Sequence, residues 1–190
     1  MRIGEGLSFL SMIVPAKYSD SAFVATVMME AVEIPMMEEH RVPEDHLVAI
    51  CQHDETLYSW RNANLYMVDG KPVAGLISYT GNGYHEVKVR TFKLVPPDVL
   101  DFDPFTMDDE TRDGEYYLDS LAVLPEYRGR GIGTALLRYG IEIARSQGLL
   151  PILACDPGNK NAYRLYCSLG FKTEGTLNIF GQEYLRMVWR

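Results

Sequence analysis

Three alternating glycines that follow an apolar run constrain the fold of this chain more than any other feature. Residues 121–124 have the composition of a strand, and an amphipathic helical pattern begins at Ile132. At Gly129, Gly131 and Gly133 no Cβ blocks the close approach of a ligand to the backbone. Because such a strand-to-helix turn directs free N–H groups and the helix dipole at one point, it predicts an anion site suited to a pyrophosphate.

The spacing of the glycines indicates which kind of pyrophosphate binds. A dinucleotide-binding Rossmann pattern would need glycine at Thr134 or Leu136, and a Walker pattern would need a Gly-Lys-Ser/Thr sequence beginning at Thr134. The chain instead fits Arg-x-x-Gly-x-Gly, at Arg128, Gly131 and Gly133. This pattern resembles the acyl-CoA pyrophosphate loop of the GCN5-related N-acetyltransferase (GNAT) superfamily.

A second block, residues 159–171, resembles the other signature of that superfamily, Asn-x-x-Ala-x-x-Leu-Tyr followed by Leu-Gly-Phe. Its apolar residues have helical spacing, and Gly170 is a natural helix C-cap. The resemblance implies that Asn159 lies beside the CoA arm. It also implies that Tyr166 points its hydroxyl at the thioester sulfur and acts as the general acid.

Further site residues follow from the resemblance. The backbone of Leu121 and Val123 is expected to bond the pantetheine amides as an added strand would, and an N–H near Val123 to stabilise the carbonyl oxygen. The predicted cofactor is acetyl-CoA, as acyl donor. The predicted cofactor-binding residues are Leu121, Ala122, Val123, Arg128, Gly129, Arg130, Gly131, Ile132, Gly133, Thr134 and Asn159.

The general base stays open between two carboxylates. An alkylamine with a pKa of about 10.4 must lose a proton before it attacks, which costs roughly 4–5 kcal/mol at pH 7. Glu115, Tyr117 and Asp119 alternate along one predicted strand and share a face unless a bulge intervenes. Asp119 is expected close to the reacting carbonyl, and Glu115 nearer the mouth of the site.

The order of the elements alternates between helix and strand, which indicates an α/β protein. The resemblance implies a single GNAT-like domain over residues 1–190, with a mixed central sheet splayed into a V around the acyl-CoA site and helices on both faces. The expected strands are 12–15, 64–68, 72–79, 87–93, 116–123, 149–154, 171–174 and 184–189. The expected helices are 22–33, one or two short ones between Pro35 and His53, 132–147, and one that begins at Asn159.

An acidic insertion is expected at about residues 94–114. Eight carboxylates and a single basic residue, Arg112, lie between Asp98 and Glu115. If this segment lies at the mouth of the acceptor side, its negative field favours a cationic acceptor. The alternative is a solvated surface loop. A variant with Asp108, Asp109 and Glu110 all neutralised would distinguish them.

Composition excludes several other classes of function. The net charge of −8 and a pI near 5.0 argue against a nucleic-acid partner. No apolar run reaches membrane-spanning length. Three cysteines without a C-x-x-C pattern indicate reduced thiols in a cytoplasmic protein, and the four histidines have no metal-site spacing, so no metal is expected.

These features predict an N-acyltransferase that moves an acetyl group from acetyl-CoA directly to a primary amine, with a small cationic amine as acceptor. The alternatives are a non-catalytic CoA-binding sensor or regulatory module of the same fold, and a nucleotide-binding protein, which the glycine spacing disfavours. The sequence leaves open whether the acceptor is a polyamine, an aminoglycoside, an amino acid or a protein N-terminus. It also leaves open whether the chain forms a homodimer.

Overall fold

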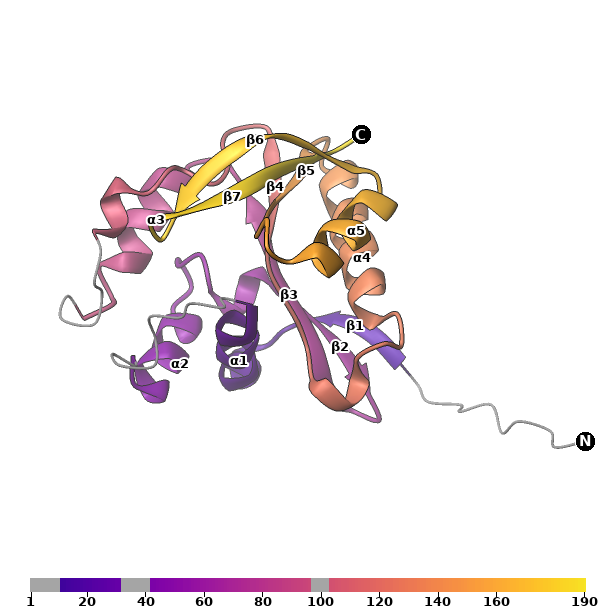
Figure 1. Ribbon diagram of the computed structural model, residues 1–190. Helices are drawn as coiled ribbons and strands as arrows, with labels where there is room; N and C mark the ends of the chain where they lie inside the picture. The colour runs from indigo at the N-terminus through magenta and orange to yellow at the C-terminus, as the bar shows by residue number, and fades with distance from the viewer. Residues whose placement is uncertain (1–10, 32–41, 97–102) are drawn as a thin grey trace, which may run out of the picture.

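The strands form one seven-stranded sheet with the spatial order β1-β2-β3-β4-β5-β7-β6 (Figure 1). The computed structural model describes residues 11–31, 42–96 and 103–190. Neighbouring strands are antiparallel except β4 and β5, which run parallel. The strands are β1 (Ser11–Pro15), β2 (Ala63–Val68), β3 (Lys71–Thr80), β4 (Glu115–Val123), β5 (Leu150–Cys155), β6 (Phe171–Ile179) and β7 (Gln182–Trp189).

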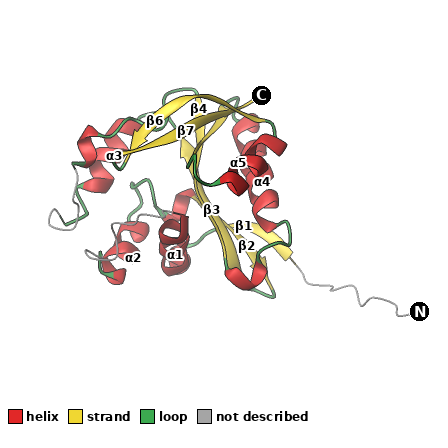
Figure 2. Cartoon of the chain, in the orientation of Figure 1, coloured by secondary structure: helices red, strands yellow, loops and turns green. Residues whose placement is uncertain are grey.

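Helices cover both faces of this sheet (Figure 2). On one face α1 packs against β3 and β4, and on the other face α4 packs against β3, β4 and β5. Each face therefore has its own hydrophobic core, and the predicted fold class is confirmed. The helices are α1 (Ser21–Ala31), α2 (Glu44–Gln52), α3 (Tyr84–Phe92), α4 (Ile132–Ser146) and α5 (Lys160–Ser168).

The amphipathic pattern of α4 explains how this helix lies on the sheet. Ile132, Leu136, Ile141 and Ala144 recur at helical spacing, and all four are buried. Gly140 lies on the same face, and a Cβ there would come within 2.7 Å of Leu118 Cδ2. This close approach holds the middle of α4 against β4, and Gly133 in the first turn lies beside Leu121 and Val123 near the end of that strand.

The two central strands separate part of the way along the sheet (Figure 1). β4 pairs with β5 only between residues 115–117 and 150–152, whereas it pairs with β3 as far as Val123. Beyond Tyr117 the edge of β4 that faces β5 therefore has no neighbouring strand. This is the predicted V-shaped opening.

A β-bulge interrupts β4 at Asp119. Ile77 of β3 pairs with Ser120 while the next residue, Ser78, pairs with Leu118, so Asp119 is the extra residue. Before the bulge Tyr116 and Leu118 pack in the α4 core, and after it Leu121 and Val123 do so. The bulge therefore shifts the alternation of β4 by one residue.

The strand predicted over residues 87–93 is wrong, because this segment belongs to helix α3. Its apolar residues alternate with polar ones, but the buried side chains are Tyr84, Lys88, Thr91 and Phe92, which recur at helical spacing. The Lys88 Nζ donates a hydrogen bond to the Met107 carbonyl at 3.0 Å. Lys88 is therefore buried on the inner face of α3, where this hydrogen bond holds its ammonium group.

The other predicted elements lie close to the observed ones. β6 is longer than predicted because the chain continues past a register shift at residue 174 and stays paired with β7. Residues 32–41, which include Pro35 and the end of the first predicted helix, lie outside the described residues.

Within the described ranges, no helix has the length and apolar character that crossing a bilayer would require.

Candidate active site

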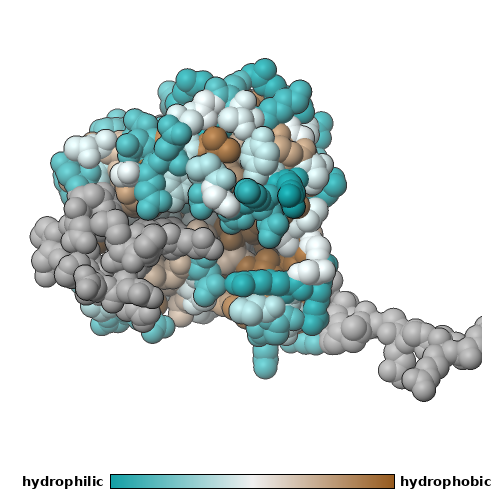
Figure 3. All heavy atoms as spheres, viewed as in Figure 1, coloured by the Kyte–Doolittle hydropathy of each residue, from teal (hydrophilic) through white to brown (hydrophobic). Residues whose placement is uncertain are grey.

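A cavity of about 620 Å³ occupies the opening between β4 and β5. In Figure 3, hydrophobic atoms are visible in a recess near the centre of this face, with hydrophilic residues around it. Two of the predicted site residues, Arg130 and Glu115, are not part of the cavity wall. The predicted residues that do line the cavity are Asp119, Leu121, Ala122, Val123, Arg128, Gly129, Gly131, Ile132, Gly133, Thr134, Asn159 and Tyr166.

The glycine loop adopts the backbone conformation for which glycine is needed. Gly129 and Gly131 have φ values of +74° and +79°, and a Cβ at either position would have no atom of the described residues within 4 Å. Gly131 is the N-cap of α4, so the N–H groups of the first turn have no acceptor within the helix. The loop therefore presents backbone donors and the positive end of the helix dipole to the cavity.

Gly133 differs from the other two glycines because it lies inside the first turn of α4. A Cβ there would make ordinary contacts of 3.6 Å with Leu121 and 3.7 Å with Val123. Its backbone does not require glycine, so any need for glycine at this position would have to come from a ligand.

The two arginines of the loop have different surroundings. Arg128 lines the cavity, where its Nε donates to the Val123 carbonyl at 2.9 Å and its guanidinium pairs with Glu30 at 3.2 Å. Arg130 instead donates to the Glu126 carbonyl at 2.8 Å and lies over the ring of Tyr127. The structure thus brings Arg128, but not Arg130, to the cavity.

The open edge of β4 can bond an extended ligand. Just after β4, the Leu124 N–H donates a hydrogen bond to the Val73 carbonyl of β3 at 2.9 Å. Because hydrogen-bonding direction alternates along an antiparallel pair, the backbone groups of Leu121 and Val123 point away from β3, toward the opening. This is the edge at which the sequence places pantetheine.

Asn159 and Tyr166 line the same cavity as the loop. The Asn159 side chain caps α5 by accepting a hydrogen bond from the Ala162 N–H at 3.0 Å. The Tyr166 ring packs edge-on against Phe171, and within the described residues no hydrogen-bond partner of its hydroxyl is found. Burial, and secondarily Cys155, raises the pKa of Tyr166 to about 12, so this hydroxyl stays protonated and able to donate.

Two carboxylates, the half-buried Asp119 and the buried Glu110, also line the cavity. Asp119 accepts a very short hydrogen bond from the Tyr79 hydroxyl and another from Ser120 Oγ at 2.7 Å. Burial raises the pKa of Asp119 above its usual value. Glu110 is only 8% exposed, whereas the second alternative for the acidic segment, a solvated loop, would expose it. No signal in the sequence distinguishes Glu110 from its neighbours, because its burial depends on contacts with Tyr84 and Tyr117 that only the tertiary structure forms.

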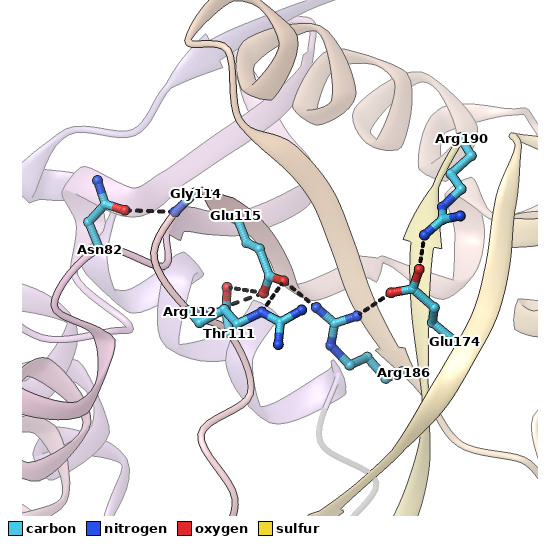
Figure 4. A network of polar contacts seen from close by, with 8 residues as sticks. All are labelled: Asn82, Thr111, Arg112, Gly114, Glu115, Glu174, Arg186 and Arg190. Carbon is cyan, nitrogen blue, oxygen red and sulfur yellow. Dashed lines mark hydrogen bonds and ion pairs between the residues drawn. The ribbon is translucent and has the colours of Figure 1, made fainter.

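Glu115 belongs to an ion-pair network outside this cavity (Figure 4). Its carboxylate pairs with Arg112 at 2.9 Å and also with Arg186, which pairs in turn with Glu174 at 3.0 Å. Arg190 pairs with Glu174 at the exposed end of the network. The structure therefore separates Glu115 from Tyr166 and Asp119, with which the sequence grouped it.

This network yields a prediction about stability. Replacing Arg186 with methionine is expected to lower the free energy of unfolding by about 3 kcal/mol, because the buried Glu115 loses a partner. Replacing the exposed Arg190 with methionine is the matched control and should change it by about 0–1 kcal/mol. Urea denaturation measures both, and equal effects of the two changes would contradict the buried role of Arg186.

The acidic segment is largely bonded within the fold. The Asp108 carboxylate accepts the Asn178 N–H of β6 at 2.7 Å, and Asp109 pairs with Lys88 at 2.5 Å and His85 at 3.1 Å. Asp108 and Asp109 nevertheless remain exposed, and the attraction of a cationic acceptor by this segment stays a prediction. Asp98 and Asp101 of the same segment lie outside the described residues.

The described residues contain no group of three or more His, Cys, Asp or Glu side chains arranged to hold a metal ion.

Comparison with known protein families and proteins points to one family. A sequence model of the acetyltransferase (GNAT) family matches residues 28–171. The chain is 38% identical over 68 residues to an L-methionine sulfoximine/L-methionine sulfone acetyltransferase of Pseudomonas paraeruginosa, and 42% identical over 55 residues to a thialysine N-epsilon-acetyltransferase of Mus musculus. These matches cover 35% and 28% of this chain, and only 40% and 32% of the relatives' length.

The fold is also found in solved structures. An N-acetyltransferase from Staphylococcus aureus Mu50 superposes with a TM-score of 0.76 at 24% sequence identity. The superposition covers 93% of this chain and 99% of that one.

Proposed function

Because this chain belongs to the acetyltransferase (GNAT) family, we propose that it transfers an acetyl group from acetyl-CoA to the primary amine of a small cationic acceptor. One observation carries the proposal: a single cavity joins the glycine loop, the open edge of β4 and the Tyr166 hydroxyl. The name of one relative, the thialysine N-epsilon-acetyltransferase, supports an amine as the acceptor.

The cavity can accommodate acetyl-CoA in two parts. The pyrophosphate would accept hydrogen bonds from the loop N–H groups at residues 129–134, with Arg128 adding positive charge. The pantetheine arm would lie along the open edge of β4 and bond the backbone of Leu121 and Val123. This placement brings the thioester between α5 and the bulge in β4.

The reaction needs a proton donor for the departing thiolate and a donor for the carbonyl oxygen. Tyr166 would protonate the thiolate, because its hydroxyl is protonated at neutral pH and has no competing partner among the described residues. An N–H group of β4 near Val123 would stabilise the oxygen as it gains negative charge. Asp119 lies at the acceptor end, where its carboxylate would attract the ammonium group of the acceptor.

The test is thiol release from acetyl-CoA across a panel of amines. The panel contains a polyamine, an aminoglycoside, free amino acids and an N-terminal peptide, and we expect release with a small amine cation. Calorimetry with acetyl-CoA is run in parallel on the same protein. Tight binding without turnover on any amine would favour the non-catalytic CoA-binding module instead.

A further inference from the structure

We infer that Glu110 is the catalytic residue that accepts the proton of the acceptor ammonium in the proposed reaction. The inference rests on the proposed function and deepens it by assigning the base. A second cavity of about 630 Å³ lies beside the first, between α3 and residues 109–115. Among the described residues that line either cavity, Glu110 lines both. A proton taken up from the first cavity can therefore leave through the second.

Glu110 is held in place by neutral donors alone. The hydroxyls of Tyr84 and Tyr117 donate to its two carboxylate oxygens, at 2.8 Å and 2.6 Å. Lys88 lies on the same helix as Tyr84, but its Nζ is bonded to Asp109 and to the Met107 carbonyl. Among the described residues neither Glu110 nor Asp119 forms an ion pair. A buried carboxylate without a cationic partner is costly, and an ammonium ligand would provide that partner.

The surroundings of Glu110 favour proton transfer near neutral pH. Burial, and next the negative charge of Asp119, raises the pKa of Glu110 to about 7. A base with this pKa is partly deprotonated at neutral pH and is well matched to accept a proton. The titratable groups that face it come from four segments and are Tyr58, Tyr79, Tyr84, Lys88, Tyr117 and Asp119.

Asp119 is less suited to the same task. It lines the first cavity but not the second, so a proton that it accepted would have no direct path to the second cavity. Its charge helps to keep the pKa of Glu110 near neutrality. Asp119 therefore serves as a positioning residue for the base.

The proton balance of the reaction closes with this assignment. The ammonium gives its first proton to Glu110, which releases it to solvent. The amine nitrogen then bonds to the thioester carbon, and the carbon–sulfur bond breaks. The thiolate takes the Tyr166 proton, and the phenolate recovers the second proton of the nitrogen. The products are the acetamide, the CoA thiol and one proton.

The inference is tested by Glu110→Gln, which keeps the shape of the side chain and removes its basicity. With an amine that the wild-type protein acetylates, kcat/KM at pH 7 should fall by about 10²-fold or more. The wild-type profile of kcat/KM should rise with pH through an inflection near 7, because the carboxylate must be deprotonated, and this inflection should be absent from the variant. Acetyl-CoA affinity should be unchanged.

Two further variants make the test specific. Glu86→Gln removes an exposed carboxylate that lines the second cavity but not the first, and it should keep the wild-type rate and inflection. Tyr84→Phe removes a donor to the charged form of Glu110 and should move the inflection to higher pH, which remains measurable even if Glu110→Gln folds poorly. A wild-type rate and profile in Glu110→Gln, or an unmoved inflection in Tyr84→Phe, would overturn the inference. Absence of thiol release in the wild-type protein would instead reject the proposed function.

Discussion

Replacing Gly131 with valine is expected to weaken acetyl-CoA binding by at least about 10²-fold. Gly131 has a φ of +79° directly before the first turn of α4, and a β-branched residue is strained in that conformation by about 1–3 kcal/mol. No atom of the described residues occupies the space of its missing Cβ, so the valine side chain would project into the place of the pyrophosphate. Calorimetry with acetyl-CoA measures the loss directly.

Gly148→Val separates the effect on binding from the effect on the backbone. Gly148 has a φ of +70° and also has no described atom within 4 Å of a Cβ, but it follows the opposite end of α4, outside the cavity wall. Both variants should lose similar stability, and only Gly131→Val should lose acetyl-CoA. Equal affinity of the two variants for acetyl-CoA would refute the assignment of the loop.

Replacing Tyr166 with phenylalanine is expected to lower kcat by about 10²-fold or more, the scale of a lost general acid. The ring would keep its edge-on contact with Phe171, so the fold and the affinity for acetyl-CoA should change little. The missing hydroxyl would leave the thiolate without a donor as the carbon–sulfur bond breaks. Steady-state thiol release with the preferred amine gives kcat for both proteins.

Tyr163→Phe is the matched control, because Tyr163 lies on the same helix and does not line the cavity. Its side chain is exposed, and loss of its hydroxyl should leave kcat unchanged. If Tyr166→Phe retains the rate of Tyr163→Phe, Tyr166 is a packing residue and the thiolate takes its proton from elsewhere.

The parts of the site formed by short stretches of chain could be predicted from the sequence. The glycine loop depends on the conformation of a few consecutive residues, so its spacing was enough to predict a strand-to-helix turn and a helix that begins at Ile132. The burial of α4 follows from a periodic pattern for the same reason. The splay of β4 from β5 was predicted only through the family resemblance that these motifs carry.

Residues whose roles depend on distant partners could not be assigned in this way. Asp119 is the extra residue of a bulge whose position depends on the pairing of β4 with β3, and Glu115 is held outside the first cavity by Arg186, 71 residues away. The segment over residues 87–93 has an alternating pattern, yet it belongs to a helix whose buried Lys88 pairs with Asp109, a residue outside the segment.

Local pattern therefore determined the glycine loop at the start of α4 and the helix that carries Tyr166, which line the same cavity. Only the tertiary structure decided which carboxylates line that cavity. Glu110 and Asp109 are neighbours in sequence with the same charge, but Asp109 pairs with Lys88 of α3, whereas Glu110 is buried against the hydroxyls of Tyr84 of α3 and Tyr117 of β4. The physical reason is that burial and charge pairing are properties of the packed surroundings of a side chain, which its sequence neighbours do not specify.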